Sequence, residues 1–140
     1  SAGTGIRHSE HNLEDVTTRI FQIWIMPNQA GHAPSWGARA FPKDDRAGQF
    51  FTLASGFQND GDALPIHADA RVLGATLRKD QIADYHLGTE RLAYLVVAKG
   101  SVEIEGRKIS EGDGAALLEI DILKVRALTD AEVVLVDTAG

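Results

Sequence analysis

The fold is decided by residues 85–114, which read YHLGTERLAYLVVAKGSVEIEGRKISEGDG. Residues 92–98 are apolar and rich in strand-forming side chains, which is typical of a strand buried on both faces or nearly so. Residues 101–105 alternate between polar and apolar side chains, the pattern of a half-buried strand. Glycine-containing turns separate the strands, at 99–100, 105–106 and 111–114. Short strands joined by glycine turns at this spacing predict an all-β barrel or sandwich.

The composition fits one domain, because 140 residues are enough to build a hydrophobic core. The net charge is −6 and the lysines and arginines are scattered, so we expect no direct nucleic-acid binding through a basic patch. No apolar run is long enough to cross a bilayer and no signal-peptide pattern is visible, so we expect no membrane partner. Cysteine is absent, which excludes thiolate ligands and a cysteine nucleophile. A cytoplasmic location fits this composition.

Residues 1–11, SAGTGIRHSEH, bring histidine and glutamate close together in the sequence. If this stretch is extended, His8 and Glu10 point to one face and His11 points to the other. An imidazole and a carboxylate on one face could supply two donors to a metal ion, with further ligands coming from elsewhere. The alternative is a solvated, partly frayed terminus, and residue types alone favour that simpler interpretation.

Residues 19–26, RIFQIWIM, have the composition and alternation of a strand. The alternation gives two apolar faces, one with Phe21, Ile23 and Ile25 and the other with Ile20, Trp24 and Met26. A strand with an unpaired edge and two apolar faces is prone to aggregate. We therefore expect it to be buried, either by folding back on the barrel or by pairing with a second copy. A homodimer through the strand from Arg19 to Met26 is our hypothesis.

Two polar stretches in the second half of the chain carry alternative interpretations. Residues 59–62, NDGD, have the acidity of a calcium loop but lack its later bidentate glutamate, so a solvated turn is the better interpretation. His67 and Asp69 share a face of an extended segment and could form a hydrogen-bonded pair. A structural or solvent-facing role is the default for that pair, because the sequence signals no positioned nucleophile.

Residues 85–114 resemble the first conserved block of the cupins, small jelly-roll barrels that usually hold one metal ion. When the turn glycine of that block is set at Gly100, its glutamate ligand falls on Ala93 and its histidine pair falls on His86 and Gly88. One imidazole does not make a metal site, because a transition metal needs three or four converging donors. We therefore expect His86 to be an ordinary barrel histidine.

The second cupin block is matched only in its turn. Gly112 and Asp113 correspond to the glycine–aspartate turn of that block. The block usually supplies a third histidine shortly afterwards, and residues 117–124 contain none. The resemblance therefore implies the shape of a cupin without the metal ligands of this barrel.

A further resemblance is carried by residues 3–10, GTGIRHSE, and by the QIW sequence at 22–24. It continues at Pro27, at the Gly-x-x-Pro of 31–34 and at the PIHAD sequence of 65–69. These features are similar to those of the pirin family, whose members are two-domain, quercetinase-like cupins. The chain looks like the C-terminal half of a pirin, truncated so that it starts with the last metal-ligand motif of the N-terminal cupin.

This resemblance implies an all-β fold consisting of one cupin jelly-roll barrel, or double-stranded β-helix, with an N-terminal extension. Residues 1–26 would be a remnant of the N-terminal cupin, with its last ligand motif and one strand. Residues 27–48 are rich in glycine, proline and charged residues and would be the linker between barrels. Residues 49–140 would form the C-terminal pirin-type cupin barrel.

In pirins the N-terminal cupin binds the metal, usually iron, through three histidines and one glutamate. The resemblance implies that His8 is a metal ligand and that Glu10 is a ligand that can also accept a proton in catalysis. The other two histidines come from an early His-x-His pair, which this sequence lacks. We therefore expect iron or another divalent first-row metal in an intact family member, and no metal held stably by this chain.

Two functions remain open at this point. The favoured one is a C-terminal cupin domain of a pirin-like protein that lacks a complete metal site, is non-catalytic by itself and serves structural or interaction roles, including contacts with protein partners. The alternative is a part of a metal-dependent quercetin 2,3-dioxygenase-type enzyme whose metal site lies in the N-terminal cupin.

Overall fold

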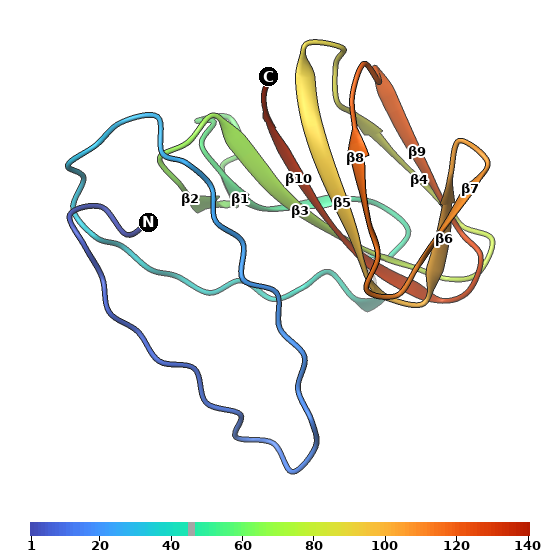
Figure 1. Cartoon of the computed structure of the whole chain (residues 1–140), viewed down its shortest axis with the longest axis horizontal. Coiled ribbons are helices and arrows are strands. Elements are labelled where there is room, and N and C mark those ends of the chain that lie inside the picture. The colour runs from blue at the N-terminus through green and yellow to red at the C-terminus, as the bar shows by residue number, and fades with distance from the viewer. Residues whose placement is uncertain (45–46) are drawn as a thin grey trace.

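A computed structural model describes residues 1–44 and 47–140 and shows a barrel made of two facing sheets. A long N-terminal arm, residues 1–26, lies outside the barrel (Figure 1). The described part of the chain contains ten strands. They are β1 (Phe51–Ser55), β2 (Leu64–Pro65), β3 (Ala70–Leu77), β4 (Ile82–His86), β5 (Arg91–Lys99), β6 (Ser101–Ile104), β7 (Arg107–Ser110), β8 (Gly114–Leu117), β9 (Ile122–Ala127) and β10 (Ala131–Ala139). The predicted all-β architecture is confirmed.

The larger sheet has the strand order β2-β1-β3-β10-β5-β8, and the smaller sheet has the order β4-β9-β6-β7. The short β1–β2 ladder is parallel. All other ladders among the described strands are antiparallel. The long strand β10 lies at the centre of the larger sheet, paired with β3 on one side and with β5 on the other. The two sheets remain separate ladders that face each other across the core.

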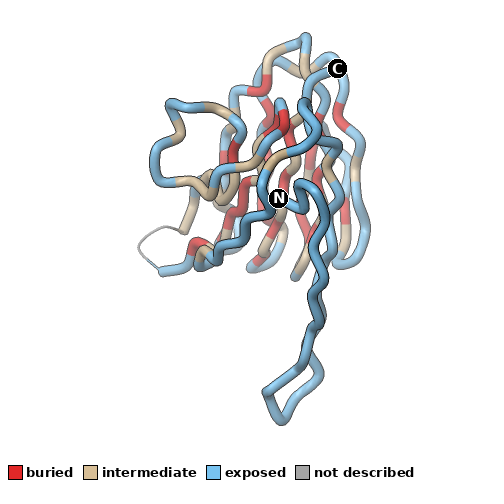
Figure 2. The backbone as a smooth tube through the Cα atoms, turned by 90° about the vertical axis from the view of Figure 1, so that its left-hand side faces the viewer, coloured by how far each residue is buried: buried red, intermediate tan, exposed pale blue. Residues whose placement is uncertain are grey.

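The core follows from the period-two alternation of the strands, which turns every second side chain inward. In β10, Val133 and Leu135 are fully buried, while Val134 between them is only partly covered. Leu95 of β5 and Val125 of β9 come from the two different sheets and are also completely buried. Each such side chain contributes about 1.5–3 kcal/mol through burial. Figure 2 shows that the buried residues gather inside the barrel, whereas the N-terminal arm is exposed.

The tight turn between β6 and β7 confirms the turn predicted at 105–106. Glu105 and Gly106 both have positive φ angles, of 50° and 75°, as a two-residue hairpin of this twist requires. Gly100 has a φ of 77°, and a Cβ atom there would lie 2.1 Å from the carbonyl oxygen of Asp130. The sequence needs glycine at 100 for both reasons, because only glycine combines this conformation with so close a backbone contact.

The strand predicted at 19–26 is wrong for this chain, because none of these residues belongs to a strand. The segment is extended, but it runs across the outer face of the larger sheet rather than along an edge (Figure 1). A face presents side chains and not free backbone groups, so it offers no ladder to the segment. The extended segment expected around His67 and Asp69 is not part of a strand, since β2 ends at Pro65 and β3 begins at Ala70.

The predicted division of the chain at residues 26 and 48 stays a prediction. The linker assigned to 27–48 is described except for residues 45–46, which lie outside the described residues. Within the described ranges, no helix is long and apolar enough to cross a membrane.

Candidate functional site

The predicted metal ligands lie together on the N-terminal arm. His8 Nε2 is 3.5 Å from Glu10 Oε1, and their side chains are 56% and 54% exposed. A neutral imidazole and a carboxylate suit a divalent first-row metal, so the pair fits as part of a ligand set. Two donors do not define a coordination geometry, and the described residues contain no group of three histidine, cysteine or acidic side chains that could hold an ion. The assignment of His8 and Glu10 as ligands stays a prediction.

The positions that match the cupin ligands in the barrel hold no ligand set among the described residues. His86 ends β4 with its side chain 75% exposed, and its Nε2 lies 3.5 Å from Asp121 Oδ1 on the surface. Ala93, where the cupin glutamate would fall, is a buried core residue of β5. The barrel interior at this level is therefore built from apolar and ion-paired side chains.

A buried carboxylate organises one end of the barrel. Asp137 of β10 is completely buried, because it lies opposite Ala93 on the inward face of the larger sheet. The hydroxyl of Tyr85 donates a hydrogen bond to Asp137 Oδ2 at 2.5 Å. Arg91 Nε donates one to Asp137 Oδ1 at 2.5 Å. Arg71 approaches the same carboxylate, with its Nη1 3.7 Å from Oδ2. Both oxygens of the buried charge are thus satisfied.

The two arginines are held in turn by outer carboxylates. Arg71 Nε donates to Asp60 Oδ2 at 2.6 Å. Arg91 Nη1 donates to Asp69 Oδ1 at 2.8 Å. Both guanidinium groups lie over the ring of Phe57, with the Cζ atoms 4.0 and 5.3 Å from its centroid. We call the six polar residues of this network the mouth cluster: Asp60, Asp69, Arg71, Tyr85, Arg91 and Asp137.

The pKa shifts within the mouth cluster favour a structural role for it over a role in acid–base catalysis. Burial raises the pKa of Tyr85, and its hydrogen bond to Asp137 raises it further. Its hydroxyl therefore stays protonated near neutral pH and serves as a donor. The hydrogen bond from Arg71, followed by the one from Ser55, lowers the pKa of Asp60. The shift of Asp60 favours its ionised form, and the shift of Tyr85 favours its neutral form. A buried ion pair such as that of Asp137 with Arg91 is strongly destabilising to break when only one partner is removed.

Two stretches with open interpretations are resolved by these contacts. Asp60, in the predicted acidic turn, accepts hydrogen bonds from Arg71 and Ser55, so this carboxylate is engaged within the protein. The carboxylate of Asp69 is bound by Arg91, while the ring of His67 stacks on the ring of His32 with centroids 3.5 Å apart. His67 and Asp69 therefore have separate partners, as expected for structural roles.

Sequence reasoning did not find the mouth cluster. One signal was available: Asp137 follows the apolar VVLV run of 133–136 directly, and in β10 the buried positions alternate and include Asp137. A carboxylate on the buried face of a strand needs cationic or hydrogen-bonding partners. Those partners lie 46 and 52 positions away, at Arg91 and Tyr85, so the sequence pattern does not reveal which they are.

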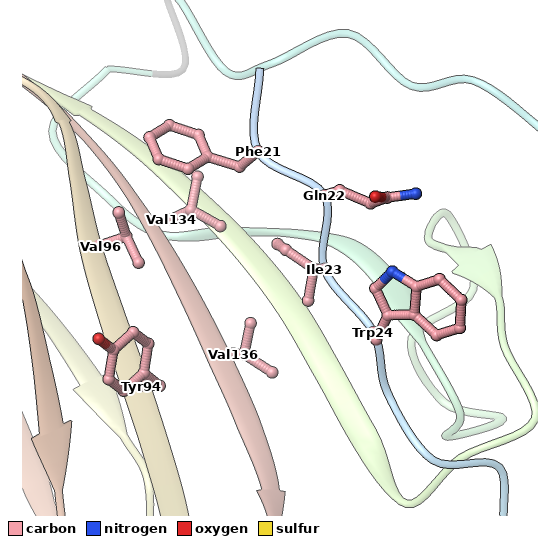
Figure 3. A pocket seen from close by; sticks show the side chains of 8 residues that line it. All are labelled: Phe21, Gln22, Ile23, Trp24, Tyr94, Val96, Val134 and Val136. Atoms are coloured by element: carbon pink, nitrogen blue, oxygen red, sulfur yellow. The ribbon is translucent and has the colours of Figure 1, made fainter. Parts of the chain in front are cut away.

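A second feature is an apolar groove between the arm and the outer face of the larger sheet. Its volume is about 290 Å³. Phe21 and Ile23 point toward Val134 and Val136 of β10, whereas Gln22 and Trp24 point away from the sheet (Figure 3). The predicted alternation of the segment is therefore retained although its strand ladder is absent. Trp24 stays 87% exposed.

The relationship to known proteins agrees with this geometry. Residues 52–138 match the family described as the quercetinase C-terminal cupin domain. The chain belongs to this family. A crystal structure of the bacterial pirin YhhW from Escherichia coli in complex with nickel(II) has a TM-score of 0.72 and 29% sequence identity to this chain. The match covers 83% of this chain and 48% of that one, and the predicted cupin jelly roll is confirmed.

Curated relatives of this cupin carry pirin and quercetinase names. A pirin-like protein of Caulobacter vibrioides is 58% identical over 139 residues, which are 99% of this chain and 60% of the relative. A quercetin 2,3-dioxygenase of Escherichia coli is 37% identical over 138 residues, which are 98% of this chain and 58% of the relative. The predicted pirin resemblance is confirmed. This chain spans about 60% of the length of the curated relatives that it matches.

Proposed function

We propose that the barrel of this chain is the non-catalytic C-terminal cupin of a pirin-like protein and serves structural and interaction roles. The observation that carries the proposal is the mouth cluster. Cupin chemistry needs converging metal ligands with an open coordination position. At the corresponding end of this barrel, Asp137 is instead fully buried and bonded through both oxygens to Tyr85 and Arg91. Such an interior supports a fold, and within the described residues both oxygens of its buried carboxylate are engaged by protein donors rather than by an ion.

The interaction role is supported by the arm. Its outward side chains Ile20, Trp24 and Met26 are 59%, 87% and 87% exposed, a composition suited to contact with another protein surface. We keep a homodimer through residues 19–26 as one form of this contact, and a second protein as the other. A cytoplasmic location is proposed along with it. Light scattering that finds only monomers at high protein concentration would count against the homodimer.

The second candidate function is a share in a quercetin 2,3-dioxygenase-type reaction through the arm. It is favoured by the 3.5 Å approach of His8 to Glu10 and by a relative that bears that name. The nickel(II) in the related pirin structure supports iron or another divalent first-row metal as the ion. When bound, such an ion supplies Lewis acidity and open positions for substrate. His8 would contribute an imidazole nitrogen, and Glu10 a carboxylate that also accepts a proton. The other ligands would come from outside these residues.

Metal retention tests the two functions against each other. The chain is loaded with iron(II) or nickel(II), dialysed and assayed for bound metal beside a His8→Ala variant. We expect no retained metal in either protein, because the described residues offer at most a two-donor site. A His86→Ala variant is the matched control for the exposed histidine in the barrel. Near-stoichiometric metal that disappears only in His8→Ala would overturn the non-catalytic proposal for this chain and restore the enzymatic one.

A further inference from the structure

A polar pocket lies at the β2–β1 edge of the larger sheet, where a residue of the predicted linker meets the barrel. Its volume is about 430 Å³, a size that suits a small molecule. The linker, β1 and the loop between β1 and β2 all contribute to it. We call it the edge pocket, and its described lining residues are Arg39, Phe51, Thr52, Asp60, Asp62 and Ala63.

The guanidinium group of Arg39 lacks an acceptor in the described part of the chain. Its Nε is buried and has no hydrogen-bond partner there. None of the ion pairs between described residues includes this arginine. A buried N–H without an acceptor is unfavourable, because its hydration is lost and not replaced. An incoming carboxylate would satisfy the guanidinium well, since the two groups can form a pair of parallel hydrogen bonds.

Two carboxylates line the same pocket and restrict the kind of anion that it can take. Asp62 is exposed and forms no ion pair with another described residue. Asp60 is held in place, because its Oδ2 accepts hydrogen bonds from Arg71 and Ser55. These bonds, the one from Arg71 first, lower the pKa of Asp60 and keep it ionised. A purely anionic ligand would be repelled by these charges, whereas a ligand with an ammonium group would be attracted.

The strand that forms one wall of the edge pocket is irregular beside it. Thr52 pairs with Leu73 and Ala54 pairs with Val72 of β3, so Leu53 is an extra residue in β1. Bulges of this kind are common at sheet edges and beside binding sites, where they redirect side chains. The bulge lies next to Thr52, whose hydroxyl adds a neutral hydrogen-bonding group to the pocket lining.

We propose that the edge pocket binds a small zwitterion of the α-amino acid class. Arg39 binds the carboxylate of the ligand, and Asp62 together with Asp60 binds its ammonium group. Each charge of the ligand then meets an opposite charge of the protein, which a ligand with one charged group cannot achieve. Binding also fastens the linker to the barrel, because Arg39 belongs to the first and Asp60 is bonded to Arg71 of the second. This gives the cupin a ligand-binding role in addition to the roles proposed above.

A panel of the common L-amino acids tests the site in the intact chain, with binding followed by NMR through the backbone amides of Thr52 and Ala63. We expect at least one amino acid to shift both resonances with a dissociation constant below about 1 mM. Its analogue without the amino group and its analogue without the carboxylate should each bind at least about tenfold more weakly. Each analogue loses one charged hydrogen-bonding pair.

Two variants assign the charged groups of the ligand to their partners. Arg39→Gln should raise the dissociation constant of the amino acid at least about tenfold, because the carboxylate loses its cation. Asp62→Asn should weaken the amino acid by a similar factor and leave the deaminated analogue bound as well as before or better, since a repulsion is removed. Arg107→Gln is the matched control, because that arginine is exposed on β7 of the other sheet, and it should bind like the native chain.

The proposal would be overturned if no amino acid of the panel shifted the Thr52 and Ala63 resonances of the native chain. A folded Arg39→Gln variant that kept the native affinity would also overturn it. So would a deaminated analogue that bound the native chain as tightly as the amino acid, because the pocket would then take a simple anion and the carboxylates would have no role in binding.

Discussion

The mouth cluster and the His8–Glu10 pair both join carboxylates to nitrogen donors, yet they differ in burial and in saturation. Asp137 is completely buried and both of its oxygens accept hydrogen bonds. His8 and Glu10 are more than half exposed and share a single 3.5 Å contact. A buried charge persists only when its partners satisfy it, whereas an exposed pair contributes little and can exchange its contact for another. Burial and hydrogen-bond saturation therefore distinguish the polar residues that stabilise the barrel from His8 and Glu10, whose side chains remain accessible to a ligand.

The largest effect is expected from removing the buried carboxylate. Asp137→Ala leaves Arg91 and the hydroxyl of Tyr85 without their acceptor inside the barrel. We expect the free energy of unfolding to fall by about 3–5 kcal/mol, measured by urea denaturation. Asp121→Ala is the matched control, since that carboxylate is 59% exposed beside His86, and it should lose less than about 1 kcal/mol. Equal losses in the two variants would contradict the distinction.

A smaller effect is expected from deleting one donor to that carboxylate. Tyr85→Phe removes the hydrogen bond to Asp137 and keeps the ring that packs edge-on against Phe50. The loss should be about 1.5–3 kcal/mol, as for a hydrogen bond to a charged group. Tyr94→Phe tests the same chemical change at a side chain that is half exposed on the outer face, and urea denaturation should find it nearly neutral. A neutral Tyr85→Phe variant would show that the cluster is not stabilising as described.

The raised pKa of Tyr85 predicts a loss of stability in alkali. The unfolded tyrosine ionises near pH 10.0, whereas the folded one, partly buried and bonded to Asp137, keeps its proton at higher pH. Its contribution is therefore complete below pH 10.0 and declines as the pH rises above it, by at most about 1.4 kcal/mol per pH unit. Unfolding free energies measured across this range should decline less steeply in Tyr85→Phe than in Tyr94→Phe. Parallel declines would contradict the assigned shift.

The smallest change in stability is expected from a substitution on the arm. Glu10→Ala removes an exposed carboxylate whose contact with His8 is 3.5 Å long. We expect the free energy of barrel unfolding to change by less than about 0.5 kcal/mol in urea denaturation. A loss comparable to that of Tyr85→Phe would show that the arm pair is part of the barrel's structure, and the comparison would fail.

The strands were predictable because their signals are local. Alternation and glycine turns placed β5, β6 and the turn at Glu105 and Gly106 close to where they lie. The segment at 19–26 carries the same local signals and still forms no strand, since a strand also needs a partner edge. The residue pattern predicted the alternation of its side chains correctly. Its backbone forms no ladder, because the segment lies over a face of the neighbouring sheet and not along an edge.

The candidate site was predictable only in part. His8 and Glu10 are two residues apart, so an extended chain brings them to one side, and the structure places them 3.5 Å apart. The mouth cluster joins β3, β4, β5 and β10, and its contacts depend on the fold as a whole. The stack of His32 on His67 depends on where the linker crosses the barrel, which no periodicity encodes.

The most direct test of the account is the unfolding free energy of the native chain with and without nickel(II) or iron(II). If the mouth cluster holds the barrel without a metal, saturating metal should change the free energy of unfolding by less than about 0.5 kcal/mol. A metal that bound the folded barrel at a hundred times its dissociation constant would instead add about 2.7 kcal/mol. A gain of that size, retained in His8→Ala, would place a metal site inside the barrel and contradict the structural role assigned to Asp137 and its partners.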